Sequence, residues 1–128
     1  MSVWVHHLKS FEFLPNYTMG QYSGMAVRVG AGIESWEMFN HMGTHNITVV
    51  APGGATVGMM GGWLAVGGHG GITSKLGLGS DQVLSIQVVT ADGRFVTADP
   101  FTNSDLFWAL RGGGPSKGTW SPEPCFYV

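Results

Sequence analysis

The chain has 128 residues, a formal net charge of −2 and only 11% charged residues. Its length allows one small domain or part of a larger one, and its charge excludes the basic surface that binds nucleic acids or anionic membranes. No run of residues is apolar enough to span a bilayer. Hydrophobic residues make up 44% of the chain, which is enough for a core despite 21 glycines, and the single Cys125 excludes an intrachain disulfide.

The first third of the chain predicts strands followed by a helix. Residues 3–8 and 11–14 are β-prone, Pro15-Asn16 indicates a turn, and the alternation over residues 26–29 predicts another strand. An amphipathic helix ending at Gly43 follows. It is predicted from apolar residues at helical spacing: Ile33, Trp36, Phe39 and Met42.

The remainder predicts a short buried strand, a helix, a hairpin and a final helix. Residues 47–50 indicate the strand, and residues 56–66 a glycine-rich helix capped by Thr56. Strands over 83–90 and 94–98 flank Ala91-Asp92-Gly93, a strong hairpin signal. A helix begins near Asn103 or Ser104 and ends at Arg111 to Gly114. This order predicts an α+β domain, because a hairpin of adjacent antiparallel strands does not fit a purely parallel sheet.

The densest glycine run lies between Thr56 and Asp81. Glycine loses more backbone freedom on folding than any other residue, so a compensating contact is expected there. Backbone without side chains allows a flat ring or a pyrophosphate to approach closely, and successive N–H groups can bind anionic oxygens. The run therefore predicts a bound ligand. Its glycines are Gly58, Gly61, Gly62, Gly67, Gly68, Gly70, Gly71, Gly77 and Gly79.

Several motifs in this order resemble the FAD-linked oxidoreductases with a PCMH-type (vanillyl-alcohol-oxidase-like) flavin domain, and within them the berberine-bridge-enzyme-like and 6-hydroxynicotine-oxidase-like branch. The likeness runs from about Ser2 to Ser116. The motifs that carry it are TVG at 56–58, GG at 61–62, GGHG at 67–70, SKLGL at 74–78, DQV at 81–83, VVTADG at 88–93 and DLFWALRGGG at 105–114.

The resemblance implies a partial PCMH-type FAD-binding domain, α+β, with a mostly antiparallel sheet flanked by helices. Residues 1–116 would supply the end of the first subdomain and much of the second, with FAD extended between the two. Residues 117–128 do not look family-like and are predicted to be a divergent tail. The start of the chain has no apolar signal-peptide segment. Localisation is therefore left unknown, with secretion possible for intact relatives.

The resemblance also implies which residues bind FAD. The Thr56-Val57-Gly58 turn and the glycine helix would lie against the flavin, and residues 78–83 would follow the length of the cofactor. A helix N-terminus at Thr56 would suit the pyrophosphate. No catalytic or metal residue is predicted. The predicted cofactor-binding residues are Gly53, Gly54, Thr56, Val57, Gly58, Gly61, Gly62, Gly67, Gly68, His69, Gly70, Leu78, Asp81 and Val83.

The resemblance implies departures as well. The histidine that often attaches covalently to the flavin lies upstream of Ser2 in related chains, and Gly54 stands where some relatives carry a flavin-linked cysteine. Covalent attachment residues are thus absent from this chain. The expected function is an FAD-binding fragment of an enzyme that oxidises a small organic substrate, passing hydride to flavin and electrons to oxygen. The fragment alone is expected to be inactive, since the substrate domain is missing.

Other interpretations compete with this one. A noncatalytic interaction module is the alternative from another class, because an apolar surface without its covering domain would bind a partner. Glu37, His41 and His45 have helical spacing for metal ligands, but a solvated helix face is preferred. Residues 29–32 (VGAG) are a weak dinucleotide-binding fingerprint that lacks its third glycine.

Three candidate residues have alternative roles that the sequence leaves open. His69 could stabilise flavin charge or hydrogen-bond the loop backbone. Asp81 could bind a ribose hydroxyl or cap a turn. Arg111 could meet a phosphate or complement a helix dipole.

Overall fold

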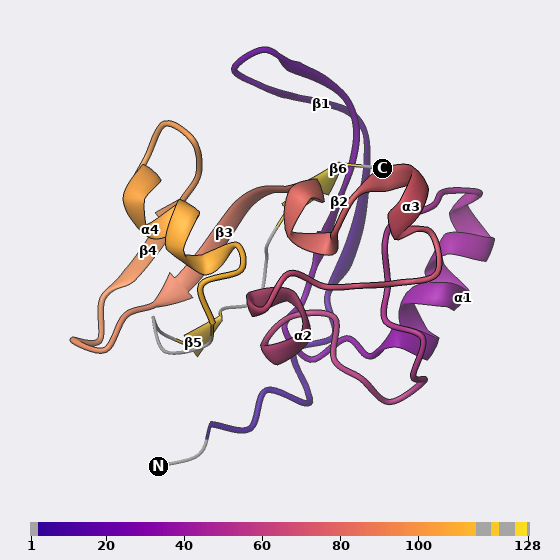
Figure 1. Ribbon diagram of the computed structural model, residues 1–128, viewed down its shortest axis with the longest axis horizontal. Helices are drawn as coiled ribbons and strands as arrows, with labels where there is room; N and C mark the ends of the chain where they lie inside the picture. Colours follow the sequence, from indigo (N-terminus) through magenta and orange to yellow (C-terminus); the bar gives the residue numbers. More distant parts are fainter. Residues whose placement is uncertain (1–2, 115–118, 121–124, 128) are drawn as a thin grey trace.

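The computed structural model describes residues 3–114, 119–120 and 125–127. Pairs of antiparallel strands are separated along the chain by short helices (Figure 1). The strands are β1 (Phe11–Met19), β2 (Tyr22–Val29), β3 (Val83–Val89), β4 (Phe95–Ala98), β5 (Thr119–Trp120) and β6 (Cys125–Tyr127). The helices are α1 (Ser35–His45), α2 (Gly62–Ala65), α3 (Thr73–Leu76), the 3-10 helix η1 (Gly79–Gln82) and α4 (Ser104–Leu110).

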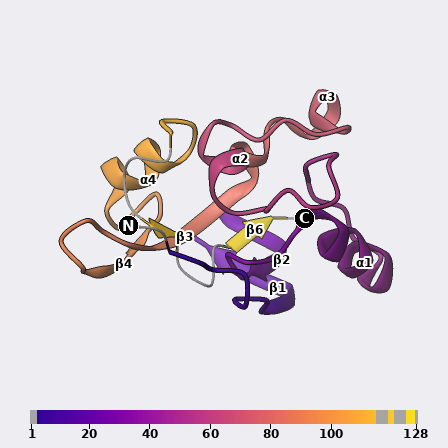
Figure 2. The same ribbon diagram turned by 90° about the horizontal axis from the view of Figure 1, so that it is seen from below.

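The described strands form one antiparallel sheet in the order β1-β2-β6-β3-β4, and β5 pairs with β3 beside this path. Strand β6 lies between β2 and β3, so it joins the first hairpin to the second. Seen from below, α2, α3 and α4 lie above the strands, and the β1–β2 hairpin lies on the other side (Figure 2). The α+β architecture with a mostly antiparallel sheet is confirmed.

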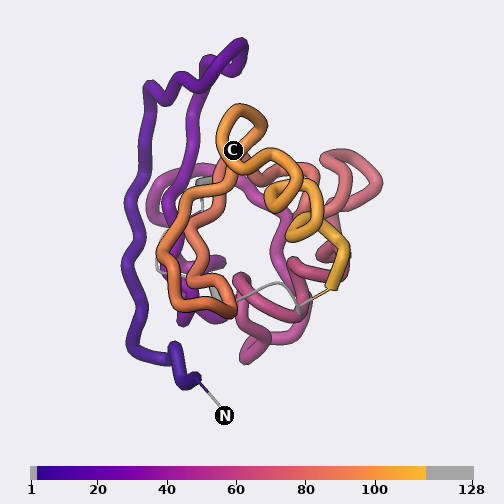
Figure 3. The backbone as a smooth tube through the Cα atoms, turned by 90° about the vertical axis from the view of Figure 1, so that its left-hand side faces the viewer, coloured from indigo at the N-terminus to yellow at the C-terminus, as the bar shows by residue number. Residues whose placement is uncertain are grey.

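The first hairpin extends as an arm beside the rest of the molecule (Figure 3). Its reversal lies between Met19 and Tyr22, where Gly20 has a φ of +58°. The turn predicted at Pro15-Asn16 is wrong, because the strand continues through these residues with a shift of register between Leu14 and Tyr17. Proline has no N–H to donate to a ladder, and an irregularity in an edge strand is a place where a sheet accepts it.

Helix α1 carries the predicted amphipathic pattern but does not end at Gly43. It runs on to His45 and stops at Asn46, which is left-handed at φ +53° and whose N–H donates to the Met42 carbonyl. Asparagine is the side chain that most readily replaces glycine in this capping conformation. The predicted stop is therefore wrong by three residues. A glycine inside a helix weakens it without ending it.

Two predicted strands are absent. Residues 3–8 form a turn closed by the Leu8 N–H on the Val5 carbonyl at 2.9 Å, which brings the rings of His6 and His7 to 5.2 Å. The side chains of successive residues on a strand would point to opposite faces, whereas this turn places the two histidine rings side by side. Residues 47–50 are extended and largely buried but join no ladder in the described sheet. The Val49 N–H instead meets the Met42 sulfur at 3.3 Å.

The second half of the fold follows the prediction closely. Strands β3 and β4 pair from Val89 opposite Phe95 onward, and Gly93 supplies the positive φ of +82° in the turn. Helix α4 begins after Asn103, again as predicted. Among the aromatic side chains of the helices, Phe107 is buried, whereas Trp36 is 49% exposed and Trp108 is 80% exposed.

One hydrophobic core joins the sheet to α1, α2 and α4. Strands β2 and β3 direct alternate side chains into it. Helices α2 and α4 close it from the side that Figure 2 shows above the strands, and α1 lies to the right of the strands in that view. Its most deeply buried apolar side chains are Ile33, Met38, Met59, Leu64, Ile86, Leu110, Val27, Val29 and Val88.

Candidate functional site

Residues 53–58 form an exposed loop that caps helix α1. The first N–H groups of a helix have no partner within it, and here Ser35 donates to the Val57 carbonyl at 2.9 Å and Trp36 to the Ala55 carbonyl at 3.0 Å. The Ser35 hydroxyl also donates to the Pro52 carbonyl. The Thr56-Val57-Gly58 turn is thereby fixed in position by backbone hydrogen bonds, while Thr56 and Val57 remain exposed.

The glycine-rich helix predicted from Thr56 to Val66 is wrong in all but its last turn. Residues 53–61 form turns and bends on either side of an isolated β-bridge between Gly58 and Glu34, and only α2, four residues long, is helical. Gly61 immediately before it has a φ of +116°, which a helix does not allow. The predicted helix N-terminus at Thr56 does not exist, and a dipole-based pyrophosphate site there is withdrawn with it.

The second half of the run holds η1 in place. Gly67 and Gly68 have φ values of +110° and +80°, a region that side chains disfavour, and their carbonyls accept the N–H groups of Ser80 at 2.9 Å and Gly79 at 2.8 Å. These two hydrogen bonds dock residues 79–82 directly on the GGHG segment. Motifs separated by ten residues in the sequence therefore form one continuous piece of backbone.

Trp63 fills the concave side of that piece. A Cβ added to Gly79 would stand 2.7 Å from its ring, and one added to Gly68 would stand 3.1 Å away. The indole Nε1 donates to the His69 carbonyl at 2.9 Å. The packing of this ring against Gly68 and Gly79 explains why these positions have no side chain, and the explanation requires no ligand.

The remaining candidate residues split between exposed and buried positions. His69 is exposed, and its backbone carbonyl receives the tryptophan hydrogen bond. Asp81 accepts the Leu78 N–H at 2.8 Å through Oδ2, so its carboxylate caps η1. This is the structural role that the sequence left open for Asp81. Val83 is buried at the start of β3.

Arg111 joins the end of α4 to the same segment. Its Nε donates to the Ser80 carbonyl at 2.6 Å, and a second guanidinium nitrogen lies 3.9 Å from Asp81 Oδ1. The guanidinium also lies over the Phe107 ring, 4.9 Å from its centroid. The side chain thus fastens α4 to η1, a role that neither sequence interpretation anticipated.

Whether the chain fits a large planar nucleotide is tested by the space at its glycines. A Cβ added to Gly53, Gly61 or Gly62 would meet nothing within 4 Å. The φ of +116° accounts for glycine at position 61, but no group of the described chain accounts for the missing side chain at positions 53 and 62. Gly70 is different, because its Cβ would collide with the Ala51 carbonyl. The glycine-rich region therefore has an open part, at residues 53–62, and a part that the protein itself fills except at Gly71. The open part fits a cofactor that lies close to the backbone.

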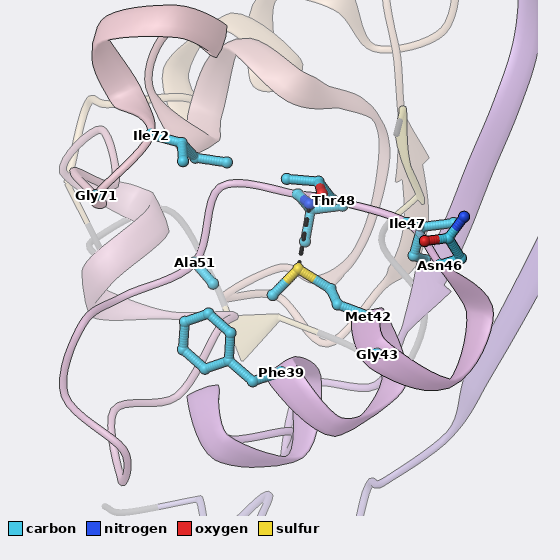
Figure 4. A pocket seen from close by; sticks show the side chains of 10 residues that line it. Phe39, Met42, Gly43, Asn46, Ile47, Thr48, Ala51, Gly71 and Ile72 are labelled. Carbon is cyan, nitrogen blue, oxygen red and sulfur yellow. Dashed lines mark hydrogen bonds between the residues drawn. The ribbon is translucent and has the colours of Figure 1, made fainter.

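A separate cavity of about 460 Å³ lies between α1, residues 46–51 and the start of α3 (Figure 4). Met42 and Phe39 border it from the helix, and Ile72 from the opposite side. None of the predicted cofactor-binding residues lines it. The sequence analysis missed this hollow because it assigned Phe39 and Met42 to the core face of a helix, although Phe39 is 51% exposed.

The competing metal interpretation has no support within the described residues, where no three His, Cys, Asp or Glu side chains come together to hold an ion. His41 stacks on Phe11 with the ring centroids 3.9 Å apart. Glu37 pairs with Lys9 at 2.6 Å. Burial works to raise the pKa of Glu37, but the Glu34 N–H and the Lys9 ammonium outweigh it, and the pKa is lowered. These side chains stabilise α1 against the N-terminal segment.

The N-terminal segment packs against the glycines of the dinucleotide-like fingerprint. Gly30 donates its N–H to the Ser10 carbonyl at 2.7 Å, and a Cβ on Gly32 would collide with the Val5 carbonyl. The N-terminal segment thus lies where a phosphate would have to approach.

None of the helices in the described part of the chain has the length and apolarity that a bilayer crossing requires.

The antiparallel α+β fold and its glycine-rich segment are those of an FAD-binding domain. The chain belongs to this family: the FAD binding domain matches residues 18–99. It is 44% identical over 114 residues to the VAO-type flavoprotein oxidase VAO615 of Thermothelomyces thermophilus, a match that covers 89% of this chain and 20% of that protein. The chain therefore spans about a fifth of the length of this relative.

Solved structures agree. The VAO-type flavoprotein MtVAO615 from Myceliophthora thermophila superimposes with a TM-score of 0.91 at 40% identity, covering 96% of this chain and 22% of that one. The 6-hydroxy-D-nicotine oxidase from Arthrobacter nicotinovorans gives 0.80 at 28% identity, covering 95% and 25%. The predicted resemblance and fold are confirmed, and FAD is the cofactor of the family.

Proposed function

We propose that this chain binds FAD through the exposed backbone of residues 53–62, as the cofactor-binding part of an FAD-linked oxidoreductase. The observation that carries the proposal is the open space at Gly53, Gly61 and Gly62, in a chain whose family binds FAD. Fixing the backbone of so many glycines costs conformational entropy, and a ligand that binds the folded state stabilises it against this cost.

The predicted cofactor residues divide into two roles. Gly53, Gly54, Thr56, Val57 and Gly58, with Gly61 and Gly62, form the surface that contacts the cofactor. The others hold or extend that surface: Gly67, Gly68, Gly70 and Val83 are buried and support it, while His69, Leu78 and Asp81 are exposed along its continuation. The 1–116 and 117–128 division remains a proposal, with residues 1–116 as the partial FAD-binding domain.

The oxidoreductase would act on a small organic substrate. Bound FAD supplies the acceptor for a hydride and the route for electrons to oxygen. The chain's own part is to bind and orient the cofactor, and no side chain of the described residues is assigned to proton transfer. The 128 residues by themselves are inactive in this proposal, because a substrate pocket and a general base would come from the rest of a full-length enzyme.

Titration of the purified protein with FAD tests the proposal. Binding quenches or shifts flavin fluorescence and perturbs its absorbance, and a saturable change at a one-to-one ratio is expected. Free riboflavin, which lacks the pyrophosphate and adenosine, serves as the control ligand and is expected to bind more weakly. Absence of any saturable change with FAD would refute the assignment.

A second function is favoured by one observation, the large apolar side chains that the described residues leave exposed. Trp108 is 80% and Phe101 is 70% exposed. Exposed apolar side chains that gather in a patch mark interaction surfaces. In this alternative the chain is a noncatalytic module that pairs with another polypeptide. Sedimentation or size-exclusion chromatography separates the two, since a stable oligomer without FAD binding favours the module.

A further inference from the structure

Two hollows adjoin each other between α1 and α3. The first is the cavity of about 460 Å³ in Figure 4, and the second, of about 320 Å³, is bordered by Met25, Lys75 and Leu76. Because part of their lining is common to both, they form one groove over the extended segment that follows α1. The shared residues are Asn46, Ile47, Thr48 and Ile72. A groove of this size accommodates a small organic molecule.

Two glycines in the walls of this groove are not explained by any contact of the described residues. A Cβ added to Gly43 or Gly71 would meet nothing within 4 Å, and neither residue has a positive φ. Gly43 moreover lies inside α1, where glycine weakens the helix relative to alanine. Side chains at these positions would extend into open space at the wall of the groove, so the two glycines keep the groove open.

Lys75 gives the groove a positive charge at one end. Among the described residues that line the two hollows, none is acidic and Lys75 is the one charged side chain. Lys75 is exposed and forms no ion pair within the described part of the chain. Asn46 and Thr48 add an amide and a hydroxyl group to the same hollow. An anion that reaches Lys75 would therefore gain an attraction that no carboxylate of the described residues already satisfies.

We propose that the groove binds a small amphipathic carboxylic acid. Its apolar body lies among Phe39, Met42 and Ile72, which border the first hollow from facing sides (Figure 4). Its carboxylate lies beside the Lys75 ammonium in the second hollow. Burial of the apolar body favours binding, and the ion pair sets the orientation of the ligand. The predicted FAD-binding residues line neither hollow, so this ligand and FAD occupy separate surfaces.

The four isoleucines of the chain report on the groove directly in an NMR titration without FAD. Ile47 and Ile72 line the groove, whereas Ile33 and Ile86 are buried in the core and border neither hollow. With ¹³C-labelled δ1-methyl groups and naphthalene-2-carboxylate as the ligand, we expect a saturable shift of the Ile47 and Ile72 signals alone. The neutral 2-naphthamide has the same ring system and is the control ligand. It is expected to bind about two- to fivefold more weakly, the range that an exposed ion pair provides.

Variants separate the charge of the groove from its shape. Lys75→Gln should weaken binding of the carboxylate about two- to fivefold and leave binding of the amide unchanged. Gly71→Leu fills the groove and should weaken both ligands by about tenfold or more. Ser74→Leu is its matched control, because Ser74 is exposed in α3 and lines neither hollow. The core signals of Ile33 and Ile86 check that each variant folds. If Gly71→Leu fails to fold, Lys75→Gln and the two ligands decide.

Three results would overturn the proposal. In the first, naphthalene-2-carboxylate shifts neither Ile47 nor Ile72. In the second, the carboxylate binds no better than the amide, or Lys75→Gln binds it as tightly as the wild-type protein does. In the third, the Ile47 and Ile72 signals move with protein concentration and not with the ligand, which would mean that a second copy of the chain covers the groove. All three leave the proposed function intact, because FAD binding is measured separately by flavin fluorescence.

Discussion

The two kinds of glycine in the run are expected to respond in opposite ways to the same change. In Gly68→Ala the new methyl group would lie 3.1 Å from the Trp63 ring, on a backbone with φ +80°. The left-handed conformation costs about 1–2 kcal/mol, and moving the ring adds to this, so we expect a loss of about 2 kcal/mol. In a chain of this size that loss lowers Tm by roughly 8 °C.

Gly62→Ala is expected to weaken FAD binding without loss of stability. Its Cβ meets nothing within 4 Å, and residue 62 is helical, so stability without FAD should stay unchanged or rise by up to about 1 kcal/mol. Its affinity for FAD should fall, because the methyl group occupies the cofactor surface. Gly43→Ala is the control, being equally open but outside the run. Urea unfolding and FAD titration measure both effects. Equal destabilisation by Gly62→Ala and Gly68→Ala would refute the division.

Two further predictions concern the supports of the site. Burial lowers the pKa of His41, and the charge of His45 lowers it further. As the pH falls, the unfolded chain therefore binds a proton at His41 before the folded chain does, and stability decreases below about pH 6.5. His41→Phe keeps an aromatic ring against Phe11, and its Tm should fall less than that of wild type between about pH 7.5 and about pH 5; parallel profiles would contradict this. Arg111→Ala removes the hydrogen bond to the Ser80 carbonyl and should lower the free energy of unfolding by about 2 kcal/mol in urea. Arg111→Lys should recover part of it, and a loss below about 0.5 kcal/mol would show that the contact contributes little.

The sequence predicted those elements whose causes are local. The hairpin of β3 and β4 follows from an Asp-Gly turn between alternating strands, and α1 from apolar residues at helical spacing. The family resemblance then supplied what local patterns do not contain, the PCMH-type fold and its cofactor. Local signals did not predict the end of α1, because the helix continues past Gly43 and ends at Asn46.

The errors arose where contacts distant in sequence decide the outcome. Residues 56–66 have apolar spacing typical of a helix, but the Val57 carbonyl accepts the Ser35 N–H and the Met59 N–H donates to the Ile33 carbonyl, which holds residues 57–59 as a loop. Residues 47–50 are strand-prone, yet the Val50 N–H is taken by the side chain of Gln82, 32 residues away. Pro15 lies inside β1 because an edge strand tolerates an irregularity. No pattern within ten residues contains these partners.

Glycine density by itself therefore does not locate a cofactor. Trp63 explains Gly68 and Gly79, the Ala51 carbonyl explains Gly70, and neither explanation involves a ligand. Within residues 53–62, Gly53 and Gly62 have neither a positive φ nor a neighbour that an added Cβ would meet, and these two retain the argument for a bound molecule.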